Sequence, residues 1–566
     1  MAWAWRAAPP PATGAATPHS RRAGLRLHAA DPVSSVTANS SSDPEAGSSS
    51  SSSERQRTPL LQAVEQRGNR LHEVPFHVPG HKRGGSTPPG LQRLLGSALR
   101  YDLTELDGLD VLSAASGPIQ AAQQAAAEAW GAQASWFLVN GTTGGIHVAV
   151  MATCGPGQAL ILPRNAHLSA FNACVLAGCT PVYAQPCCDP QLGVAHHVTP
   201  TALQAAFETA AGRGLRVGAA LVVSPTYFGV VADVAGLAAV CHSHGVPLLV
   251  DEAHGAHLGL HPSLPPSALQ SGADVAIQST HKQLSAMTQA AMLHLAHGGR
   301  VQRQRLARAL QVLQSSSPSY LLMVSLDAAR AQAADPQAHE ESLAAAEYAR
   351  RELSKLPGLQ LLSVEQAAAC EGLSSSSGSS SSGGGGGGGS SSSSTSLDPL
   401  RLTISLQQLG LAGYEAAAAL EEQHGIVPEL ATPTCVVLAL SIGSTRQHAQ
   451  ALVNALQQLW GQRSGMSCST AGSLVNTMPS VAPAGEARLS PRDAFFAATQ
   501  AVPAAAAVGR VSAELLCPYP PGVPVTYPGE VITQQALQQL RLVLQQGGTV
   551  TGCSDASLQT LQVVAE

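Results

Sequence analysis

The sequence predicts an α/β fold built on a mostly parallel β-sheet that carries helices on both faces. Between residues 136 and 252, short apolar runs alternate with stretches of helical apolar spacing, a pattern typical of β-α-β units. Gly, Pro or Asp bounds each run and ends the predicted strand. The predicted strands are Trp136–Val139, Ala159–Leu162, Thr180–Ala184, Ala219–Val223 and Pro247–Val250, and the predicted helix between the last two is Val234–His244. Ligands bind such sheets at the carboxyl ends of the strands, so the residues that follow these runs are the first functional candidates.

Composition excludes two classes of partner. The chain has 566 residues, of which 44% are hydrophobic and 12% charged, and its formal net charge is -5. No cluster of Lys and Arg marks a nucleic-acid surface, so no nucleic-acid partner is expected. No apolar run approaches the ~18 residues of a membrane-spanning helix, so no membrane partner is expected.

Segments of biased composition divide the chain. Residues 1–56 contain four Arg before the first acidic residue, Asp31, and are rich in Ala, Pro and Ser, which is typical of an organelle transit peptide with a disordered leader. A chloroplast or other plastid is therefore the expected location, with the mitochondrion or cytosol as alternatives. Residues 374–396 are almost entirely Ser and Gly and predict a disordered insertion. The remaining expected parts are a major domain at 57–335, a small α/β domain at 336–460, a linker at 461–490 and a C-terminal domain at 491–566.

The cysteines and histidines predict no metal site. No pair among the eleven cysteines has the C-x2-C spacing of structural zinc, and their long gaps favour reduced thiols. His77 and His81 are four residues apart but have no third ligand close by, and for His254 and His257, three apart, a place beside a ligand at the sheet edge is favoured over zinc.

A Gly-rich turn follows the first predicted strand. Residues 140–145 read Asn-Gly-Thr-Thr-Gly-Gly and open an apolar helical run at Ile146. Free N–H groups, the positive end of the helix dipole and the Thr hydroxyls would all favour a phosphate there. The turn lacks the glycine patterns of P-loops and dinucleotide sites, so a smaller phosphate ligand fits better. A plain strand-to-helix turn is the alternative.

An aspartate and a lysine follow two successive strands. Asp251 comes directly after Pro247–Val250, and Lys282 follows the short apolar run at 274–277. Pyridoxal 5′-phosphate requires this pair, because the carboxylate keeps the ring nitrogen protonated and the amine forms a Schiff base. Either residue alone is commonly a surface group, so the prediction depends on their order after the phosphate-type turn.

From about residue 58 to 560 the chain resembles the Orn/Lys/Arg decarboxylase family, whose members are pyridoxal-phosphate enzymes of fold type I. The resemblance implies a large domain with a mostly parallel sheet, a small α+β domain and a C-terminal domain, in the short form without an N-terminal wing domain. It also implies decarboxylation of a basic amino acid, arginine or lysine and possibly ornithine, to CO2 and the corresponding amine of polyamine biosynthesis. The matching motifs are Phe76–Gly84, Asp102–Asp110, Pro163–His167, Ser224–Tyr227, Asp251–His257, Ser279–Lys282, Ser317–Tyr320, Cys517–Pro524 and Pro528–Glu530.

The resemblance also implies site roles. Lys282 would hold the cofactor, Asp251 would pair with its ring nitrogen, and His167 would stack on the ring. The further residues implied are Thr143, Gly144 and Ser279 at the phosphate, His254 beside the ring, His281 as proton donor, Ser316 at the neighbouring subunit's cofactor and Glu530 at the substrate's distal cation. Sites shared between subunits imply a homodimer or higher homo-oligomer. Another fold type I enzyme, such as an aminotransferase that uses Arg401 or Arg446, and a catalytically silent relative are the alternatives.

Overall fold

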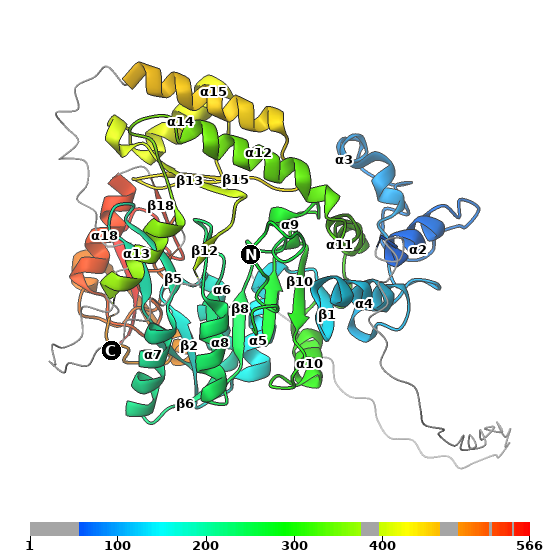
Figure 1. The fold of residues 1–566 in the computed structure, drawn as a ribbon. Helices are drawn as coiled ribbons and strands as arrows, with labels where there is room; N and C mark the ends of the chain where they lie inside the picture. Colours follow the sequence, from blue (N-terminus) through cyan, green and yellow to red (C-terminus); the bar gives the residue numbers. More distant parts are fainter. Residues whose placement is uncertain (1–55, 375–394, 464–484, 520–522, 546–547, 566) are drawn as a thin grey trace, which may run out of the picture. The chain divides into compact units, whose positions relative to one another are not determined.

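The computed structural model describes residues 56–374, 395–463, 485–519, 523–545 and 548–565 (Figure 1). Three predicted segments therefore lie wholly or largely outside the described residues: the leader at 1–56, the Ser/Gly insertion at 374–396 and the linker at 461–490. Within the described residues, no helix combines the length and the apolar composition that a membrane span requires.

The predicted mostly parallel sheet is present and has seven strands, in the order β1-β10-β9-β8-β6-β2-β3. Six of them run parallel, whereas β10 runs antiparallel to both of its neighbours. The short apolar runs of the sequence form the buried strands of this sheet, as predicted. The strands are β1 (Ala134–Leu138), β2 (Gln158–Pro163), β3 (Thr180–Ala184), β6 (Arg216–Val223), β8 (Leu248–Asp251), β9 (Val275–Gln278) and β10 (Ala291–Leu295).

Helices cover both faces of this sheet (Figure 1). One face packs against α5 (Gly141–Thr153), α6 (Leu168–Ala177) and α10 (Arg303–Leu313), through a core that includes Leu160, Ile146 and Leu306. The other face packs against α2 (Pro59–Gly68), α4 (Pro118–Trp130), α7 (Pro200–Gly212), α8 (Val234–Ser243) and α11 (Tyr320–Ala333). Burial on both faces explains why these strands are continuous apolar runs without polar alternation.

A second, smaller sheet lies within the range predicted for the small domain. Its four antiparallel strands have the order β11-β13-β15-β14 and share one core with the flanking helices. These elements are β11 (Gln360–Leu361), β13 (Arg401–Ser405), β14 (Leu430–Ala431), β15 (Val436–Ala439), α12 (Gln337–Leu353), α14 (Gly413–His424) and α15 (Arg446–Arg463).

Two short strand pairs and one helix lie beside the two sheets. The hairpin of β4 (Pro186–Asp189) and β5 (Val194–Val198) contacts α13 (Val364–Ser374), and β12 (Ser396–Leu397) pairs with β7 (Val230–Val231). Shorter helical segments are α3 (Pro89–Leu95), η1 (Gly96–Arg100), η2 (Leu112–Ala114), α9 (Thr280–Gln283) and η4 (Gln407–Leu409).

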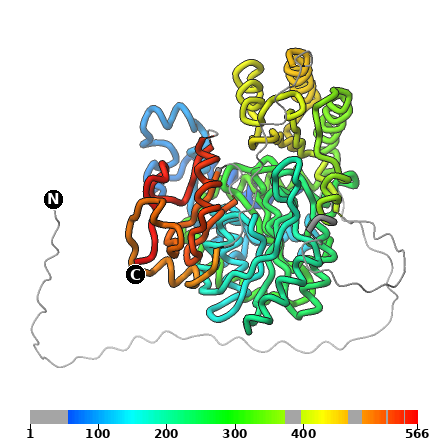
Figure 2. The backbone as a smooth tube through the Cα atoms, turned by 90° about the vertical axis from the view of Figure 1, so that its left-hand side faces the viewer, coloured from blue at the N-terminus to red at the C-terminus, as the bar shows by residue number. Residues whose placement is uncertain are grey.

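The C-terminal segment has its own small core and contacts the major domain (Figure 2). The ring of Tyr527 stacks on Phe171 of α6, with their centroids 3.7 Å apart. This contact joins the C-terminal segment to the helix that follows β2. The segment contains α16 (Pro491–Phe496), β16 (Thr499–Pro503), α17 (Ala504–Ala507), β17 (Cys517–Tyr519), α18 (Gln534–Gln545), β18 (Thr549–Thr551) and β19 (Thr560–Val564).

Candidate active site

The predicted site residues follow the carboxyl ends of parallel strands of the large sheet. Asp251 ends β8, Lys282 lies in α9 directly after β9, and His167 follows β2. The Gly-rich turn lies between β1 and α5, as predicted. Because parallel strands end at one edge of a sheet, the topology brings these four segments to the same edge.

The lysine amine has a histidine neighbour, which in turn has an arginine neighbour. Lys282 Nζ lies 3.0 Å from His254 Nε2, and His254 Nδ1 lies 3.0 Å from Arg401 Nη2. His254 and Arg401 are buried, and the ring of Tyr227 packs on His254 with their centroids 4.6 Å apart. Arg401 comes from β13, so the small domain contributes one member of this chain of contacts.

These contacts determine the protonation of Lys282. A guanidinium can only donate, so His254 Nδ1 accepts from Arg401 and the ring proton is on Nε2. Burial first, and then the charge of the neighbouring Arg401, hold the pKa of His254 well below its ordinary value, so the ring is neutral. With its proton on Nε2, the ring donates to Lys282 Nζ when the lysine is an uncharged amine, so this contact favours the uncharged form. Burial also lowers the pKa of Lys282, as does Arg401, while Asp251 opposes the shift.

Asp251 is a buried carboxylate beside two basic groups. Burial raises its pKa, whereas the neighbouring His167 and Lys282 lower it. Its Oδ1 accepts from the backbone N–H of Ala253 at 3.1 Å. Burial is likewise the largest cause that lowers the pKa of His167, so this ring is neutral. A positively charged group bound next to this buried carboxylate would stabilise its charged form.

Hydroxyl and amide groups meet at the start of α5. Thr142 Oγ1 lies 3.1 Å from Ser279 Oγ, which precedes α9. The N–H of Gly141 donates to Gln289 and that of Gly144 donates to Asn140, so the helix geometry leaves the amides of Thr142 and Thr143 without an intrahelical acceptor. The assignments of Thr143 and Gly144 to a phosphate remain predictions. The structure adds Thr142, because the helical turn aims this hydroxyl at Ser279.

Close packing requires glycine at Gly145. A Cβ atom there would lie 2.5 Å from Ile277 of β9 and 2.7 Å from Leu138 of β1. The start of α5 therefore lies directly against the strands that lead to the lysine and to the Gly-rich turn.

Two other predicted residues, His281 and Ser316, have different surroundings. His281 Nδ1 donates to the carbonyl of Ala290 at 2.9 Å, which leaves Nε2 available to exchange a proton. Ser316 is exposed and lines a pocket of 440 Å³ with Gln314 and Arg303. No contact between Ser316 and Lys282, Asp251 or His167 of the same chain is found among the described residues.

Glu530, predicted to face the substrate, has partners within the chain. Glu530 Oε1 pairs with Arg164 Nη1 at 2.7 Å, and both side chains are almost completely buried. Glu530 Oε2 accepts from the backbone N–H of Tyr527 at 3.2 Å. The carboxylate predicted to face the distal cation of a substrate is therefore occupied by an internal arginine, and it joins the C-terminal segment to the loop that precedes His167.

Sequence reasoning also missed most of what surrounds the lysine. Arg401 entered only as a possible aminotransferase residue, and the structure places it next to His254. Arg446, the other candidate, is exposed and stacks on Tyr348. Nearby, the buried Asp398 Oδ1 lies 3.0 Å from His257 Nε2. Local motifs carry no signal for such pairs, because their members are more than a hundred residues apart in the sequence.

Comparisons with known proteins agree on one family. Residues 58–448 match the Orn/Lys/Arg decarboxylase major domain, and residues 476–550 match the Orn/Lys/Arg decarboxylase C-terminal domain. An arginine decarboxylase of Bacillus subtilis is 36% identical over 515 residues, which cover 90% of this chain and 98% of the relative. A lysine decarboxylase of Pseudomonas aeruginosa is 26% identical and covers 81% of this chain and 72% of the relative. The solved structure of the constitutive lysine decarboxylase of E. coli is similar with a TM-score of 0.72 and 20% identity, and covers 90% of this chain and 82% of that one.

Proposed function

Because this chain belongs to the Orn/Lys/Arg decarboxylase family, we propose that it uses pyridoxal 5′-phosphate to decarboxylate a basic amino acid, arginine in the first place, to CO2 and the corresponding amine. The contact of Lys282 with His254 and Arg401 carries the proposal, since burial and Arg401 lower the pKa of this lysine and so favour the uncharged, nucleophilic amine. Arginine is preferred over lysine because three relatives that are 34–36% identical over most of this chain are named arginine decarboxylases, whereas the lysine decarboxylases are more distant.

The residues at the sheet edge fit pyridoxal 5′-phosphate. Asp251 is a buried carboxylate whose surroundings favour a positively charged partner. Thr142 and Ser279 supply hydroxyls, and the first turn of α5 supplies amides, for a phosphate. Arg401 Nε and Thr280 Oγ1 are buried and have no hydrogen-bond partner among the described residues, so donors remain for a bound anionic group.

Each residue then has a chemical task. When it is bound, the cofactor supplies an aldehyde that condenses with amines and a protonated ring that withdraws electrons from the substrate. Asp251 would hold the positive charge at the ring nitrogen, and the neutral His167 would lie against the ring face. His254 would orient the Lys282 amine, and His281 would carry a proton on Nε2 for the substrate carbon.

The decisive assay supplies arginine, lysine and ornithine separately to purified protein and measures CO2 and amine together. The proposal expects equal amounts of CO2 and amine, the highest kcat/KM for arginine, and no turnover by Lys282→Ala. Lys355→Ala is the matched control. Lys355 is an exposed lysine just after α12, and it pairs with Glu352 at the end of that helix. Turnover by Lys282→Ala equal to that of the wild type would exclude the proposal.

One observation favours transamination as a second candidate. Aminotransferases use a small-domain arginine to bind the substrate α-carboxylate, and Arg401 of the small domain lies beside His254. A transaminase would retain the carboxylate and release a keto acid. Keto acid formed from the amino acid without CO2, when a second α-keto acid is added to accept the amino group, would favour this candidate over decarboxylation.

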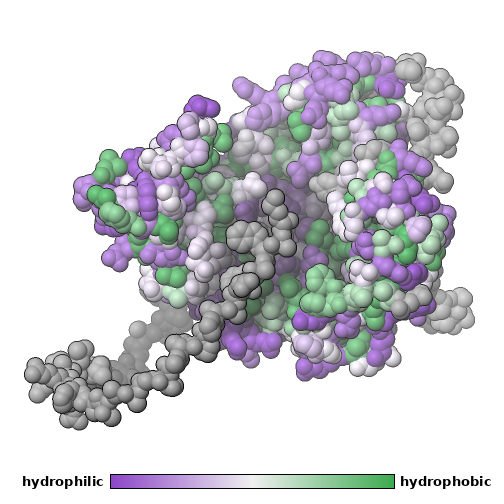
Figure 3. Space-filling view, turned by 180° about the vertical axis from the view of Figure 1, so that it is seen from behind, coloured by the Kyte–Doolittle hydropathy of each residue, from purple (hydrophilic) through white to green (hydrophobic). Residues whose placement is uncertain are grey.

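We also propose that the active unit is a homodimer. Several large apolar side chains around α3 and in the loop before it are strongly exposed, Phe76 at 92%, and the same lobe carries apolar surface in Figure 3. An apolar patch of this kind favours a protein partner, and a second copy would also bring its Ser316 to the site as the family resemblance implies. The other exposed residues are Leu71, Val74, Val78, Leu91 and Leu94. A monomeric mass in solution at micromolar concentration would contradict the dimer.

For location we propose import into a plastid directed by residues 1–56. The family match begins at residue 58, so this segment precedes the conserved domains, and its composition supports the proposal. The similar arginine decarboxylases are bacterial and provide no support for it. A fluorescent protein fused to residues 1–56 should enter plastids, and a diffuse cytosolic signal would contradict the proposal.

A further inference from the structure

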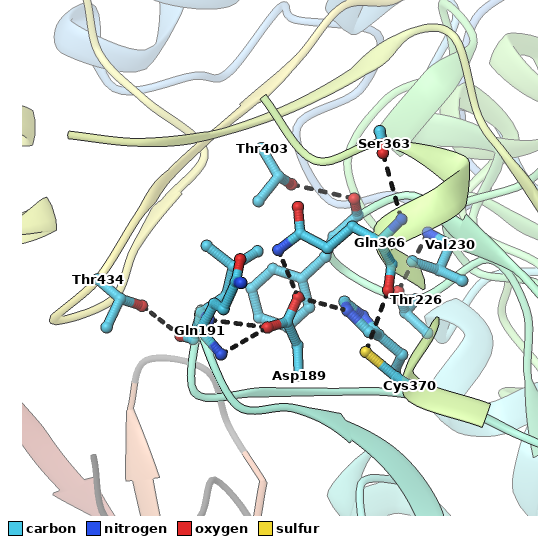
Figure 4. A network of polar contacts seen from close by, with 12 residues as sticks. Asp189, Gln191, Thr226, Val230, Ser363, Gln366, Cys370, Thr403 and Thr434 are labelled. Carbon is cyan, nitrogen blue, oxygen red and sulfur yellow. Dashed lines mark hydrogen bonds and ion pairs between the residues drawn. The ribbon is translucent and has the colours of Figure 1, made fainter. Parts of the chain in front are cut away.

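A cluster of three different metal-ligating side chains lies outside the candidate active site, where α13 packs on the β4–β5 hairpin (Figure 4). Asp189 ends β4, His196 lies within β5, and Cys370 lies on α13. One oxygen, one nitrogen and one sulfur of these residues lie within 4.8 Å of one another, and all three residues are buried. The cluster therefore joins a hairpin of the major domain to a helix that belongs to the small domain.

His196 is the unusual member of the cluster. Its side chain is completely buried, Nδ1 has no hydrogen-bond partner among the described residues, and the one neighbour recorded for Nε2 there is the Asp189 carboxylate. Nε2 lies 3.6 Å from Asp189 Oδ2, which is longer than a hydrogen bond. A buried polar group without a partner is costly, and an imidazole nitrogen with a free lone pair is a good ligand for zinc-type cations.

Asp189 is already oriented as a metal-binding carboxylate would be. Its Oδ1 accepts from the backbone N–H groups of Gln191 (2.8 Å) and Leu192 (2.9 Å), and its Oδ2 accepts from Gln366 Nε2 at 2.7 Å (Figure 4). These donors fix the carboxylate and leave one acceptor position on Oδ2, the oxygen nearest to His196. Such outer hydrogen bonds are the usual support of metal ligands.

The spacing of one ligand pair and the charges of the three groups suit a divalent cation. Zinc bonds of about 2.0 to 2.3 Å place tetrahedral ligands roughly 3.3 to 3.7 Å apart, and the pair of Asp189 Oδ2 and His196 Nε2 has this spacing. Cys370 Sγ now points at the carbonyl of Gln366 at 3.2 Å, and it would lose one proton to solvent on binding. One carboxylate, one thiolate and one neutral imidazole would make the buried site electrically neutral around a divalent cation.

We propose that Asp189, His196 and Cys370 bind a zinc-type divalent cation that fastens α13 to the β4–β5 hairpin. The described part of α13 ends at Ser374, where the Ser/Gly-rich segment begins. A cation at Cys370 therefore secures the helix one turn before the chain enters that segment. The role is structural, since it needs no part of the decarboxylation chemistry and is independent of it.

Cobalt binding tests the site directly. The full-length protein is treated with a chelator, dialysed and titrated with Co²⁺, and bound metal and the sulfur-to-cobalt charge-transfer absorption are measured. The wild type should bind one Co²⁺ per chain with thiolate absorption, and excess Zn²⁺ should remove that absorption. Loss of one protein ligand should weaken binding at least ~100-fold, because even outer-shell changes cost 10–100-fold.

Matched variants separate this site from other thiols and from the cofactor pocket. Cys370→Ser should abolish the thiolate absorption, and His196→Gln should abolish tight binding. Cys241→Ser is the control, since Cys241 is equally buried but lies on α8 outside the cluster. No thiolate absorption in the wild type, or an unchanged titration of Cys370→Ser, would overturn the proposal. The wild-type titration decides the question even if a variant fails to fold.

Discussion

Replacing Glu530 with Gln should destabilise the fold and should leave substrate preference nearly unchanged. Arg164 and Glu530 form a buried ion pair of 2.7 Å, with side chains that are 1% and 3% exposed. Arg164 also donates to the carbonyl of Val525 at 3.0 Å, and its guanidinium carbon lies 4.7 Å from the ring centres of Tyr183 and Tyr527. The substitution leaves this cation in place and removes the only negative charge among these contacts.

The cost follows from the burial of both partners. Breaking a buried pair by removing one charge costs about 3 to 5 kcal/mol, and the amide oxygen of Gln can still accept from Arg164, so we expect ~3 kcal/mol. Replacing both residues, as in Arg164→Met with Glu530→Leu, should recover most of the loss, because the uncompensated charge is then gone. Glu486→Gln is the control, since its pair with Arg488 is exposed and should cost less than ~0.5 kcal/mol.

The assay combines urea denaturation of each variant with kcat/KM for the three basic amino acids. We expect Glu530→Gln to unfold at a lower urea concentration with kcat/KM values close to those of the wild type. An unchanged unfolding curve together with a ten- to hundredfold loss of kcat/KM would refute the reasoning. That result would return Glu530 to the substrate site predicted from the sequence.

Three further predictions follow from other parts of the structure. Arg401→Met should raise the pKa of Lys282, so the reaction of this lysine with pyridoxal phosphate should move to higher pH, which absorbance measured against pH will show. An unshifted profile would contradict the effect of Arg401 on Lys282. Burial lowers the pKa of His294 to about 3. Above pH 6.5 the ring is neutral in both the folded and the unfolded chain. As pH falls from 6.5 toward 3 only the unfolded chain binds the proton, so the folded state loses up to ~5 kcal/mol of stability. His294→Gln should accordingly show a weaker acid dependence of unfolding, and equal acid dependence would exclude this cause. Deleting residues 378–390 should change the free energy of unfolding, measured by urea denaturation, by less than ~1 kcal/mol, because the entropy cost of loop closure varies slowly with loop length. Loss of soluble protein would show that the segment has a structural role.

The large sheet could be predicted from the sequence because its strands are buried on both faces. β3 has the predicted bounds, Thr180–Ala184, and β8 differs by one residue at each end. Short continuous apolar runs bounded by Gly, Pro and Asp are hard to assign to anything other than buried strands. Asp251 and Lys282 could be named in advance because a residue that follows a parallel strand lies at the ligand-binding edge, whatever the rest of the fold.

Side-chain partners could not be predicted in the same way. The sequence gives no sign that Arg164 faces Glu530, which is 366 positions away, or that Arg401 reaches His254. The choice between Thr142 and Thr143 depends on the rotation of α5, which the Gly-rich turn alone leaves open. The search for Cys-x2-Cys spacing could not find a cluster like that of Cys370, whose members lie on a hairpin and a distant helix.

The single antiparallel strand of the large sheet also affects the order in which the site can assemble. β9 and β10 are neighbours joined only by residues 279–290, which carry Lys282, whereas the pairing of β1 with β10 brings together residues about 150 positions apart. Closing the short connection costs about 2 kcal/mol less in chain entropy than closing the long one. The loop that carries Lys282 can therefore form early in folding, when β9 pairs with β10. The phosphate-type turn after β1 comes next to this loop only later, when β1 pairs with β10.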